Sequence, residues 1–456
     1  MSRIHIPTEE IRQPSFHADD LGFVFVWQDH LLRGIYPEAV DRVKAYFASG
    51  FLTAIVGQGL FPETWMTDYE NEQFGLILEH ERIDPVVYAT EWNFQMLKEA
   101  SLLVLDVART ARQFGYDMRD CYKMNVVFRR NRPVYVDLGS FVPAGTGAFG
   151  WLAHAEFLSS YYYILDIWRS GAAQIARRMM SPHEEMEARD YWLYKSRFLR
   201  NCPALLSWKL SVGKKWSGLV NLDAGRLAAY ADRWGAFAGK VIDAMRKLAI
   251  RFRLAPPVQF RRYRRKVSRF RIRDRVRSLP ELTAAETVLV DVLNDRCPDC
   301  GRVTVVNNRV CSLYACLLQR TGVKSIYSLC EDESLSRAEY AFCRQKDLPV
   351  CCMSYLLAER ETLIRDKFPE DRFRSPLVLL PAFELEDGPF RYHNAAVFLD
   401  RLMLYSSRKT IVLSLREPDD AFVGYLGERY HVESWPGPGD RCRALIVRTQ
   451  ETLDER

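Results

Sequence analysis

The stretch Val303–Glu333, VTVVNNRVCSLYACLLQRTGVKSIYSLCEDE, decides how the second half of the chain is interpreted. It contains two apolar runs, Val303–Val306 and Ser325–Leu329. Between them, Ser312–Arg320 repeats its apolar residues at the spacing of a helix. A strand, a helix and a second strand in this order predict a parallel βαβ unit.

The alternation begins near Leu289 and continues toward the C-terminus. It predicts a further helix at Ser334–Lys346 and strands at Val350–Met353, Leu377–Leu380 and Thr410–Leu415. We therefore expect a Rossmann-like α/β domain with a parallel sheet over residues 281–456.

The first half of the chain has a different pattern. We expect a strand at Phe23–Trp27, a long helix at Trp92–Phe114 that stops at Gly115, and a hairpin of Val126–Phe128 and Val134–Val136. These elements predict an α+β domain over residues 1–250, with a small β-rich lobe at about 15–90 and a helical lobe at about 91–250. A basic linker at 251–280 would join the two domains.

The composition limits the class of protein. The chain has 456 residues, of which 48% are hydrophobic and 27% charged, so we expect a folded protein of two domains. No apolar stretch is long enough for a transmembrane segment, and Met1–Glu10 lacks the apolar core of a signal peptide. We expect a cytoplasmic protein whose 11 cysteines are reduced.

Two features have competing interpretations. Cys297 and Cys300 form a CxxC that Cys311 and Cys316 could complete as a zinc site, but ordinary thiols fit this spacing better. The segment Arg251–Arg277 holds twelve Lys and Arg residues. It could contact an anionic membrane or a nucleic acid, although a solvated helix face is the simpler interpretation and nucleic acid is the less expected partner.

The loop and hairpin after the long helix carry a possible phosphotransfer site. Kinase-type sites use an Asp to orient the attacking hydroxyl, and an Asn five residues later with a second Asp to hold magnesium. Asp120, Asn125 and Asp137 occur in this order, and Gly139 allows a tight turn after the second Asp. Asp120 would be the catalytic residue, and Asn125 and Asp137 would be the metal ligands.

The other parts of a nucleotide site are less complete. No glycine-rich loop precedes the first strand, and Arg33 stands where a lysine would reach the phosphates of ATP. Glu38 or Asp41 could pair with Arg33.

The βαβ unit carries a possible nucleotide or adenosylmethionine site. Such ligands bind beyond the strand ends, on the first turn, with an acid after the second strand on the ribose. The first turn contains Asn307 and Asn308 but no glycine. Cys330 stands at the first position after the second strand, within a run of acids that includes Asp332.

Two stretches resemble a bacterial family in which a kinase-like region precedes a class I methyltransferase domain. They are Glu91–Ala100 and the block from Asp120 through Asn125–Phe128 to Arg132–Phe141. Some members of this family are host-specific nodulation proteins of rhizobia. The order of strands and helices in the second half is similar to the family as well.

The resemblance implies a transferase that uses S-adenosylmethionine on a saccharide, a lipo-oligosaccharide signal or another small-molecule acceptor. Asn307, Asn308, Cys330 and Asp332 would bind the cofactor, although the family's Asp and Gly residues are replaced at this turn. Two alternatives stay open. One is a kinase that uses ATP and Mg²⁺ with Arg33 and Asp120, and the other is a non-catalytic protein with a protein partner.

Overall fold

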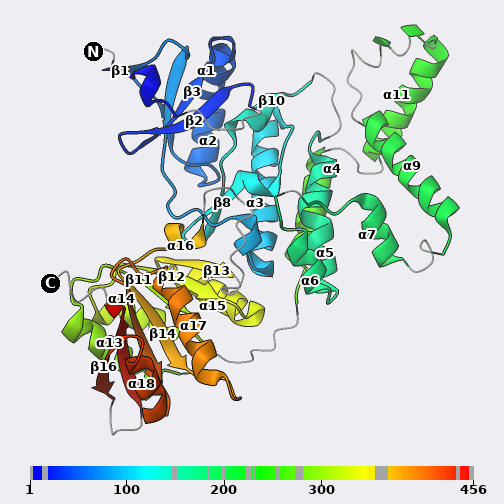
Figure 1. Cartoon of the computed structure of the whole chain (residues 1–456). Helices are drawn as coiled ribbons and strands as arrows, with labels where there is room; N and C mark the ends of the chain where they lie inside the picture. Colours follow the sequence, from blue (N-terminus) through cyan, green and yellow to red (C-terminus); the bar gives the residue numbers. More distant parts are fainter. Residues whose placement is uncertain are drawn as a thin grey trace. The chain divides into compact units, whose positions relative to one another are not determined.

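The structure, a computed structural model, describes residues 4–12, 19–145, 151–182, 184–196, 201–220, 228–229, 232–233, 235–251, 256–272, 281–354, 368–417, 419–437 and 442–450. The chain divides into two compact units (Figure 1). Unit 1 comprises Met1–Ile83, Leu97–Val127 and Pro133–Arg271, and unit 2 comprises Asp84–Met96, Phe128–Arg132 and Ile272–Arg456. Within the basic segment 251–277, residues 252–255 and 273–277 lie outside the described residues.

Unit 2 contains a seven-stranded sheet of strand order β13-β12-β11-β14-β15-β17-β16. All neighbouring pairs from β13 to β15 are parallel, and β17 is antiparallel to both β15 and β16. The strands are β11 (Arg302–Val306), β12 (Ser325–Cys330), β13 (Val350–Ser354), β14 (Leu377–Phe383), β15 (Thr410–Leu415), β16 (His431–Pro436) and β17 (Arg443–Arg448).

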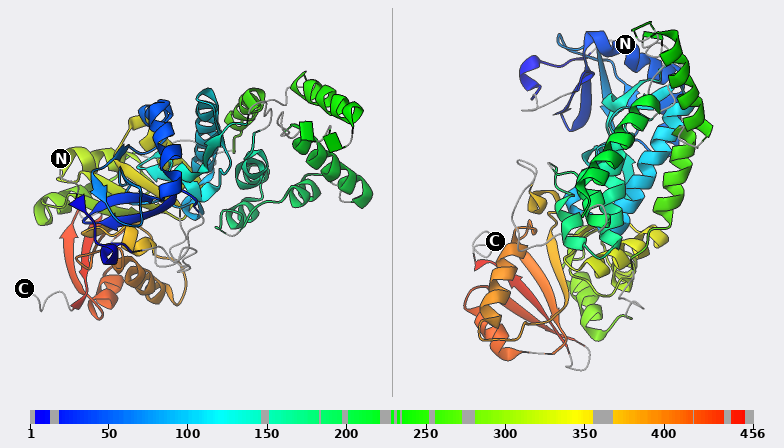
Figure 2. Two further views of the ribbon diagram at one scale, coloured as in Figure 1. Left: turned by 90° about the horizontal axis from the view of Figure 1, so that it is seen from above. Right: turned by 90° about the vertical axis from the view of Figure 1, so that its right-hand side faces the viewer.

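Helices cover both faces of this sheet (Figures 1 and 2). They are α13 (Ala284–Arg296), α14 (Ser312–Arg320), α15 (Glu333–Lys346), α16 (Pro369–Arg372), α17 (Arg391–Met403) and α18 (Asp420–Gly427). Because both faces are covered, strands such as β12 and β15 are buried almost along their whole length. The continuous apolar runs in the sequence reflect this burial.

The strands and helices predicted for the second half are confirmed. The helix predicted at Ser312–Arg320 and the strand predicted at Thr410–Leu415 have the same bounds in the structure. The sequence analysis missed the antiparallel pair β16–β17, which closes one edge of the sheet. Numbered along the chain, the order is 3-2-1-4-5-7-6, with an antiparallel seventh strand.

Unit 2 also includes two short segments from early in the chain. In the first, the buried Glu91 forms an ion pair with Arg372 of α16, and Arg372 also donates to the carbonyl of Val86. The amide of Asn93 donates to the carbonyl and the hydroxyl of Ser336 on α15, over 3.1 and 3.0 Å. A buried polar group without a hydrogen-bond partner costs free energy, and these bonds provide the partners.

The second segment is the tip of a hairpin. Phe128 packs its ring against Tyr340 of α15 at a centroid distance of 6.1 Å, and the Tyr340 hydroxyl donates to the carbonyl of Asn131. Arg132 pairs with Asp347 over 2.9 Å at the surface. Thus residues more than two hundred positions apart form one core.

Unit 1 opens with a four-stranded antiparallel sheet of order β2-β3-β6-β4. Alternation in β2 directs Phe23, Phe25 and Trp27 into the core. The strands are β2 (Gly22–Trp27), β3 (His30–Ile35), β4 (Thr64–Met66) and β6 (Leu76–His80), and the shorter pairs are β1 (Ile4–His5) with β5 (Tyr69–Glu70), β7 (Tyr116–Met118) with β10 (Phe141–Pro143), and β8 (Val126–Arg129) with β9 (Arg132–Tyr135).

The rest of unit 1 is mainly helical. The longest helix, α3, has 20 residues and is followed by Gly115 at a φ of 81°, a conformation that glycine adopts without steric cost. The helices are α1 (Val40–Ala48), α2 (Phe51–Gly57), α3 (Phe94–Gln113), α4 (His154–Phe157), α5 (Tyr163–Arg169), α6 (Ala173–Arg178), α7 (Ala188–Lys195), α9 (Pro203–Val220), α11 (Ala236–Arg251) and α12 (Pro256–Ser268).

The predicted strand at Phe23–Trp27, the long helix and the hairpin after it are confirmed as β2, α3 and β8–β9. The molecule is therefore a mixed α/β protein. The kinase-like assignment of the first half and the predicted domain boundaries stay predictions.

The Glu91–Arg372 pair should stabilise unit 2. Glu91→Ala would leave the Arg372 guanidinium buried without its carboxylate, and we expect a loss of about 3–5 kcal/mol in the free energy of unfolding. Urea unfolding followed by circular dichroism would measure this loss. Arg132→Ala, which breaks an exposed pair, should cost less than about 1 kcal/mol. Equal losses in the two variants would contradict the assignment.

Candidate ligand-binding site

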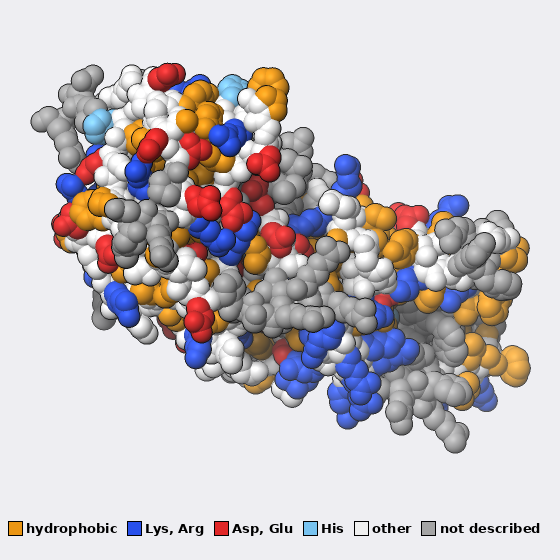
Figure 3. All heavy atoms as spheres, turned by 90° about the horizontal axis from the view of Figure 1, so that it is seen from below, with side chains coloured by type: hydrophobic (Ala, Val, Ile, Leu, Met, Phe, Trp, Pro, Cys, Tyr) orange, Lys and Arg blue, Asp and Glu red, His pale blue; other side chains and the backbone are white. Residues whose placement is uncertain are grey.

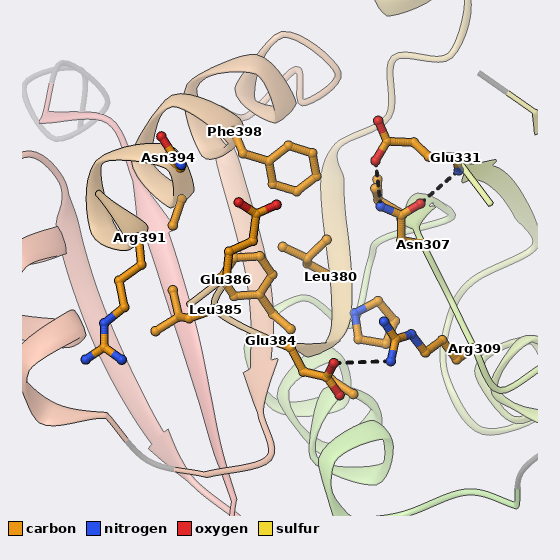
Figure 4. A pocket seen from close by; sticks show the side chains of 15 residues that line it. Asn307, Arg309, Glu331, Leu380, Glu384, Leu385, Glu386, Arg391, Asn394 and Phe398 are labelled. Atoms are coloured by element: carbon orange, nitrogen blue, oxygen red, sulfur yellow. Dashed lines mark hydrogen bonds and ion pairs between the residues drawn. The ribbon is translucent and has the colours of Figure 1, made fainter. Parts of the chain in front are cut away.

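A pocket of about 540 Å³ lies in unit 2 at the carboxyl ends of β11 and β14 (Figure 4). The strand order reverses between these two strands, and parallel sheets bind their ligands at such a switch point. The volume is in the range of small-molecule sites. The lining residues come from the ends of three strands, the loop after β14 and the first turns of α17: Val306, Asn307, Arg309, Glu331, Leu380, Pro381, Ala382, Phe383, Glu384, Leu385, Glu386, Arg391, Asn394, Ala395 and Phe398.

Asn307 and Glu331 form a bonded pair on one wall of this pocket. The Asn307 amide nitrogen donates to the Glu331 carboxylate over 3.0 Å, and the Glu331 backbone N–H donates to the Asn307 side-chain oxygen over 3.0 Å (Figure 4). The Asn307 backbone N–H also donates to the carbonyl of Leu329. The first turn and the end of the second strand are therefore fixed to each other.

The first turn keeps a conformation that usually needs glycine. Asn307 has a φ of 50°, in the left-handed region where asparagine is among the few other residues tolerated. Asn308 is fully buried, and its side chain bonds both the N–H and the carbonyl of Val310 at 3.0 Å. The two asparagines thus shape a turn without glycine.

Of the four predicted cofactor residues, the structure places Asn307 in the pocket. Asn308 lies beneath the turn. Cys330 is fully buried, its thiol bonds the carbonyl of Asp332, and burial raises the pKa of that thiol. The Asp332 carboxylate caps α15 by accepting from the N–H groups of Ser334 and Leu335. These last three residues are not among those that line the pocket.

Glu331 is a charged pocket residue that the sequence analysis did not select. It lies between Cys330 and Asp332, directly after β12, and it was passed over because neighbouring acids in a run cannot be told apart by spacing. In an extended backbone, successive side chains point to opposite sides. A test of alternation beyond the strand end could have singled out Glu331.

The opposite wall combines acidic, basic and aromatic groups. Glu384 bridges two guanidinium groups, those of Arg309 and Arg416, each over 3.2 Å. Figure 4 shows Glu386 and Phe398 close together across the pocket from the Asn307–Glu331 pair. Glu384 and Glu386 directly follow β14, where the register is irregular between Leu380 and Phe383. The pocket therefore offers charged and apolar surface side by side.

A buried acid lies behind the first turn. The Glu339 carboxylate accepts hydrogen bonds from the hydroxyls of Tyr314 on α14 and Ser328 on β12, both over 2.8 Å. Burial raises its pKa to about 7, while the two hydrogen bonds oppose this shift. The protonation state of Glu339 therefore changes near neutral pH.

In unit 1, the structure brings the predicted phosphotransfer residues near one another. The Asn125 amide donates to the Asp120 carboxylate over 3.1 Å, as does the Tyr122 backbone N–H over 2.7 Å. The Tyr135 hydroxyl donates to the carbonyl of Asp120 over 2.9 Å. The loop from Asp120 to Asn125 is thus internally fixed.

Asp137 follows β9 and caps the next turn. Its carboxylate accepts from the Gly139 backbone N–H over 3.0 Å and from the Ser140 hydroxyl. Burial raises its pKa, Arg33 and Ser140 lower it, and the nearby carboxylates of Asp19 and Asp120 raise it further. The Asp120 carboxylate is therefore close enough to raise the pKa of Asp137.

Arg33 is buried between two carboxylates. It donates to Asp19, and it lies 4.0 Å from Asp137. Its partners are therefore Asp19 and Asp137, instead of Glu38 or Asp41. A Cβ added at Gly139 would lie 2.4 Å from the Asp19 carboxylate, so glycine permits this close approach.

Glu156 adds a further acid beside Asp120. Its carboxylate accepts from the backbone N–H of Cys121, and its pKa is raised to about 7 by burial, with a contribution from Asp120. Among the described residues, however, no group of three or more His, Cys, Asp or Glu side chains is placed to hold a metal ion. The four cysteines considered as a zinc site, Cys297, Cys300, Cys311 and Cys316, are among the described residues to which this statement applies.

The comparisons with known proteins show similarity over only about a third of the chain, at low sequence identity. No protein-family model matches the chain. The nodulation protein NoeA of Rhizobium meliloti (strain 1021) is 26% identical over 150 residues, which cover 31% of this chain and 30% of that protein. The chain thus matches less than a third of this relative.

Among solved structures, methyltransferases of Rossmann-like fold match about a third of the chain. The mitomycin 7-O-methyltransferase MmcR is 13% identical, with 36% of this chain and 54% of that chain covered and a TM-score of 0.29. TrmK of M. capricolum in complex with S-adenosyl-homocysteine is 10% identical, with coverages of 38% and 70% and a TM-score of 0.27. TM-scores of 0.29 and 0.27 are too low to support any argument about this chain.

Glu339 should make the stability of unit 2 depend on pH. A carboxyl group with a raised folded-state pKa stabilises fully below its unfolded pKa of 4.5, and this contribution is lost as the pH rises through about 7. Glu339→Gln should therefore reduce the fall in unfolding free energy between pH 5 and pH 8 by about 2 kcal/mol.

Urea unfolding of the wild type and of Glu339→Gln at both pH values would measure this difference. The pKa of Glu156 is also raised to about 7, but its titration contributes equally in both proteins and cancels in the comparison. Glu428→Gln, at an exposed position after α18, is the matched control and should leave the pH dependence unchanged. A Glu339→Gln curve parallel to wild type would refute the shift.

Proposed function

We propose that unit 2 binds S-adenosylmethionine at the β11–β14 switch point and that the protein is a methyltransferase-type transferase. One observation carries this proposal: Glu331, directly after the second strand, is held in the pocket by Asn307 of the first turn. An acid at this place is the group that takes ribose hydroxyls in Rossmann-like folds, about 20 residues after the first turn. Glu331 follows Asn307 by 24 residues.

The residues present fit a nucleoside. Glu331 is an acceptor for two hydroxyl donors, and Phe398 and Leu380 give apolar surface for a flat base. The left-handed Asn307 keeps the turn open although it carries a side chain. Asn308, Cys330 and Asp332 would act through the turn and the strand end rather than by contact.

When bound, adenosylmethionine would supply a methyl group on a positively charged sulfur for transfer to an acceptor oxygen or nitrogen, with S-adenosylhomocysteine as the group that leaves. The acceptor would bind on the opposite wall, where Glu386 can accept the proton that a hydroxyl loses. Carboxylates beside Asn394 and Phe398 suit a polyhydroxylated small molecule such as a saccharide.

Replacing Glu331 should weaken adenosylmethionine binding. Glu331→Ala removes a charged acceptor for the ribose hydroxyls, so we expect a dissociation constant at least about tenfold higher, in line with about 1.5–3 kcal/mol for such bonds. Isothermal titration calorimetry measures it. Glu428→Ala removes an exposed carboxylate elsewhere in unit 2 and should bind as wild type does. Wild-type protein that binds nothing at millimolar ligand would reject the proposal.

A second candidate function is phosphotransfer from ATP in unit 1. The proximity of Asp120 and Asp137, with Asn125 bonded to Asp120, favours it. Two carboxylates and an amide are a sufficient protein contribution for Mg²⁺, which takes its other ligands from water and phosphates. Arg33 would reach a phosphate, and its Nε is buried without a hydrogen-bond partner.

This candidate predicts a thermal shift. ATP with Mg²⁺ should raise the melting temperature of the unit 1 transition by a few degrees when the ligand is well above its dissociation constant. Asp137→Asn, which keeps the shape of the side chain, should abolish this shift because it removes a metal ligand. Glu63→Gln, at an exposed position in the same unit, should keep it. A shift that survives Asp137→Asn would count against the site.

The remaining alternative is a non-catalytic protein that holds a protein partner. It predicts that neither adenosylmethionine nor ATP binds. The two binding experiments above therefore separate all three functions.

A further inference from the structure

Helix α11 carries an exposed apolar stripe. Phe237, Val241, Met245 and Leu248 have exposed fractions of 81, 41, 36 and 44%. Their spacing of four, four and three residues places them within an arc of roughly 80°, since each residue of a helix advances by about 100°. Isolated exposed apolar residues are ordinary, but a continuous row marks an interaction surface.

The stripe lies on the side of α11 opposite its buried residues. Gly239 and Ile242, on the opposite side of α11, are buried, and α11 packs against α9. Helix α9 itself exposes Trp208 to 64%. A helix that is apolar on its outer side as well as its inner side has a partner other than water.

Basic groups accompany the apolar stripe. Lys240 and Lys247 are exposed along one edge of it, and Lys247 also pairs with Asp243 of the same helix over 2.8 Å. In the same unit, α12 buries Phe260 and Val267 and carries five Lys and Arg residues with no acid. Its basic side chains at Arg261, Arg262, Arg264 and Arg265 are exposed. Figure 3 shows Lys and Arg side chains gathered on one face of the molecule, with hydrophobic side chains at the edge of that face.

We propose that the α11 stripe (Phe237, Val241, Met245 and Leu248) docks on an anionic phospholipid surface, with its lysines and the α12 arginines on the headgroups. Apolar side chains on one face and basic ones beside them are the features of helices that lie in the membrane interface. Anionic headgroups complement the positive charge of both helices. Among the described residues, no helix combines the length and apolar character needed to cross a bilayer.

The dimensions favour lipid over a second copy of the chain. The stripe is about 16 Å long and about 10 Å wide. A stable protein interface buries about 800 Å² on each partner, which is several times this area. A lipid surface requires only that a few side chains enter the headgroup region.

Co-sedimentation of the full chain with vesicles tests the proposal. Vesicles of three parts phosphatidylcholine to one part phosphatidylglycerol should bind the protein, and pure phosphatidylcholine vesicles should bind it at least about tenfold more weakly. The double variant Phe237→Ser/Leu248→Ser should reduce binding to the mixed vesicles at least about tenfold. The matched control is Val24→Ser/Val26→Ser, which removes two exposed apolar side chains from β2 of the same unit.

Three results would overturn the proposal. The first is wild-type protein that stays in the supernatant with both kinds of vesicle. The second is an equal loss of binding in the stripe variant and in the β2 control. The third is a wild-type dimer in analytical ultracentrifugation that the stripe variant converts to a monomer without any vesicle binding, because the stripe would then be a contact between copies. Circular dichroism of both variants verifies that they are folded.

Discussion

The paired hydrogen bonds between Asn307 and Glu331 are the interaction on which the ligand site of unit 2 depends. They join the turn after β11 to the end of β12, the two places where a Rossmann-like sheet contacts a nucleoside. Without them, a non-glycine residue at a φ of 50° would be a strained turn with no compensation. With them, the turn is rigid and the carboxylate of Glu331 is oriented before any ligand arrives.

The same pair shows how a turn without glycine can hold a left-handed conformation. Glycine permits a left-handed turn because it has no Cβ, whereas asparagine permits it through local hydrogen bonds of its side chain. Asn307 uses its amide on Glu331, and Asn308 uses its amide on Val310. Side-chain hydrogen bonds therefore hold this turn, whereas a glycine-rich loop depends on the absence of a Cβ.

Much of unit 2 could be predicted from sequence because parallel strands buried on both faces read as short apolar runs, as in Val303–Val306. The antiparallel pair β16–β17 could not, since β16 is half exposed and carries charged residues such as Glu433. Local patterns also identified the turn at Asn307 but could not choose among the successive acids after β12. That choice depends on which way each side chain points once α15 has begun at Glu333.

The long-range contacts could not be predicted from local sequence patterns. Nothing near Glu91 in the sequence indicates that its partner is Arg372, and nothing near Phe128 indicates Tyr340. The proximity of Arg33 to Asp19 has the same origin, because the pair forms only when the antiparallel sheet of unit 1 is in place. The sequence analysis identified Arg33 but not Asp19, Arg372 or Tyr340, because only the folded chain brings these partners together.

The membership of Asp84–Met96 and Phe128–Arg132 in unit 2 has a practical meaning for dissecting the protein. A single cut near residue 272 would release a C-terminal fragment that lacks two of its own structural pieces. Arg372 would then lose its counter-ion, and the ring of Tyr340 would lose its neighbour. The two units are interlaced along the sequence, so a fragment that keeps unit 2 whole has to include residues 84–96 and 128–132 together with 272–456.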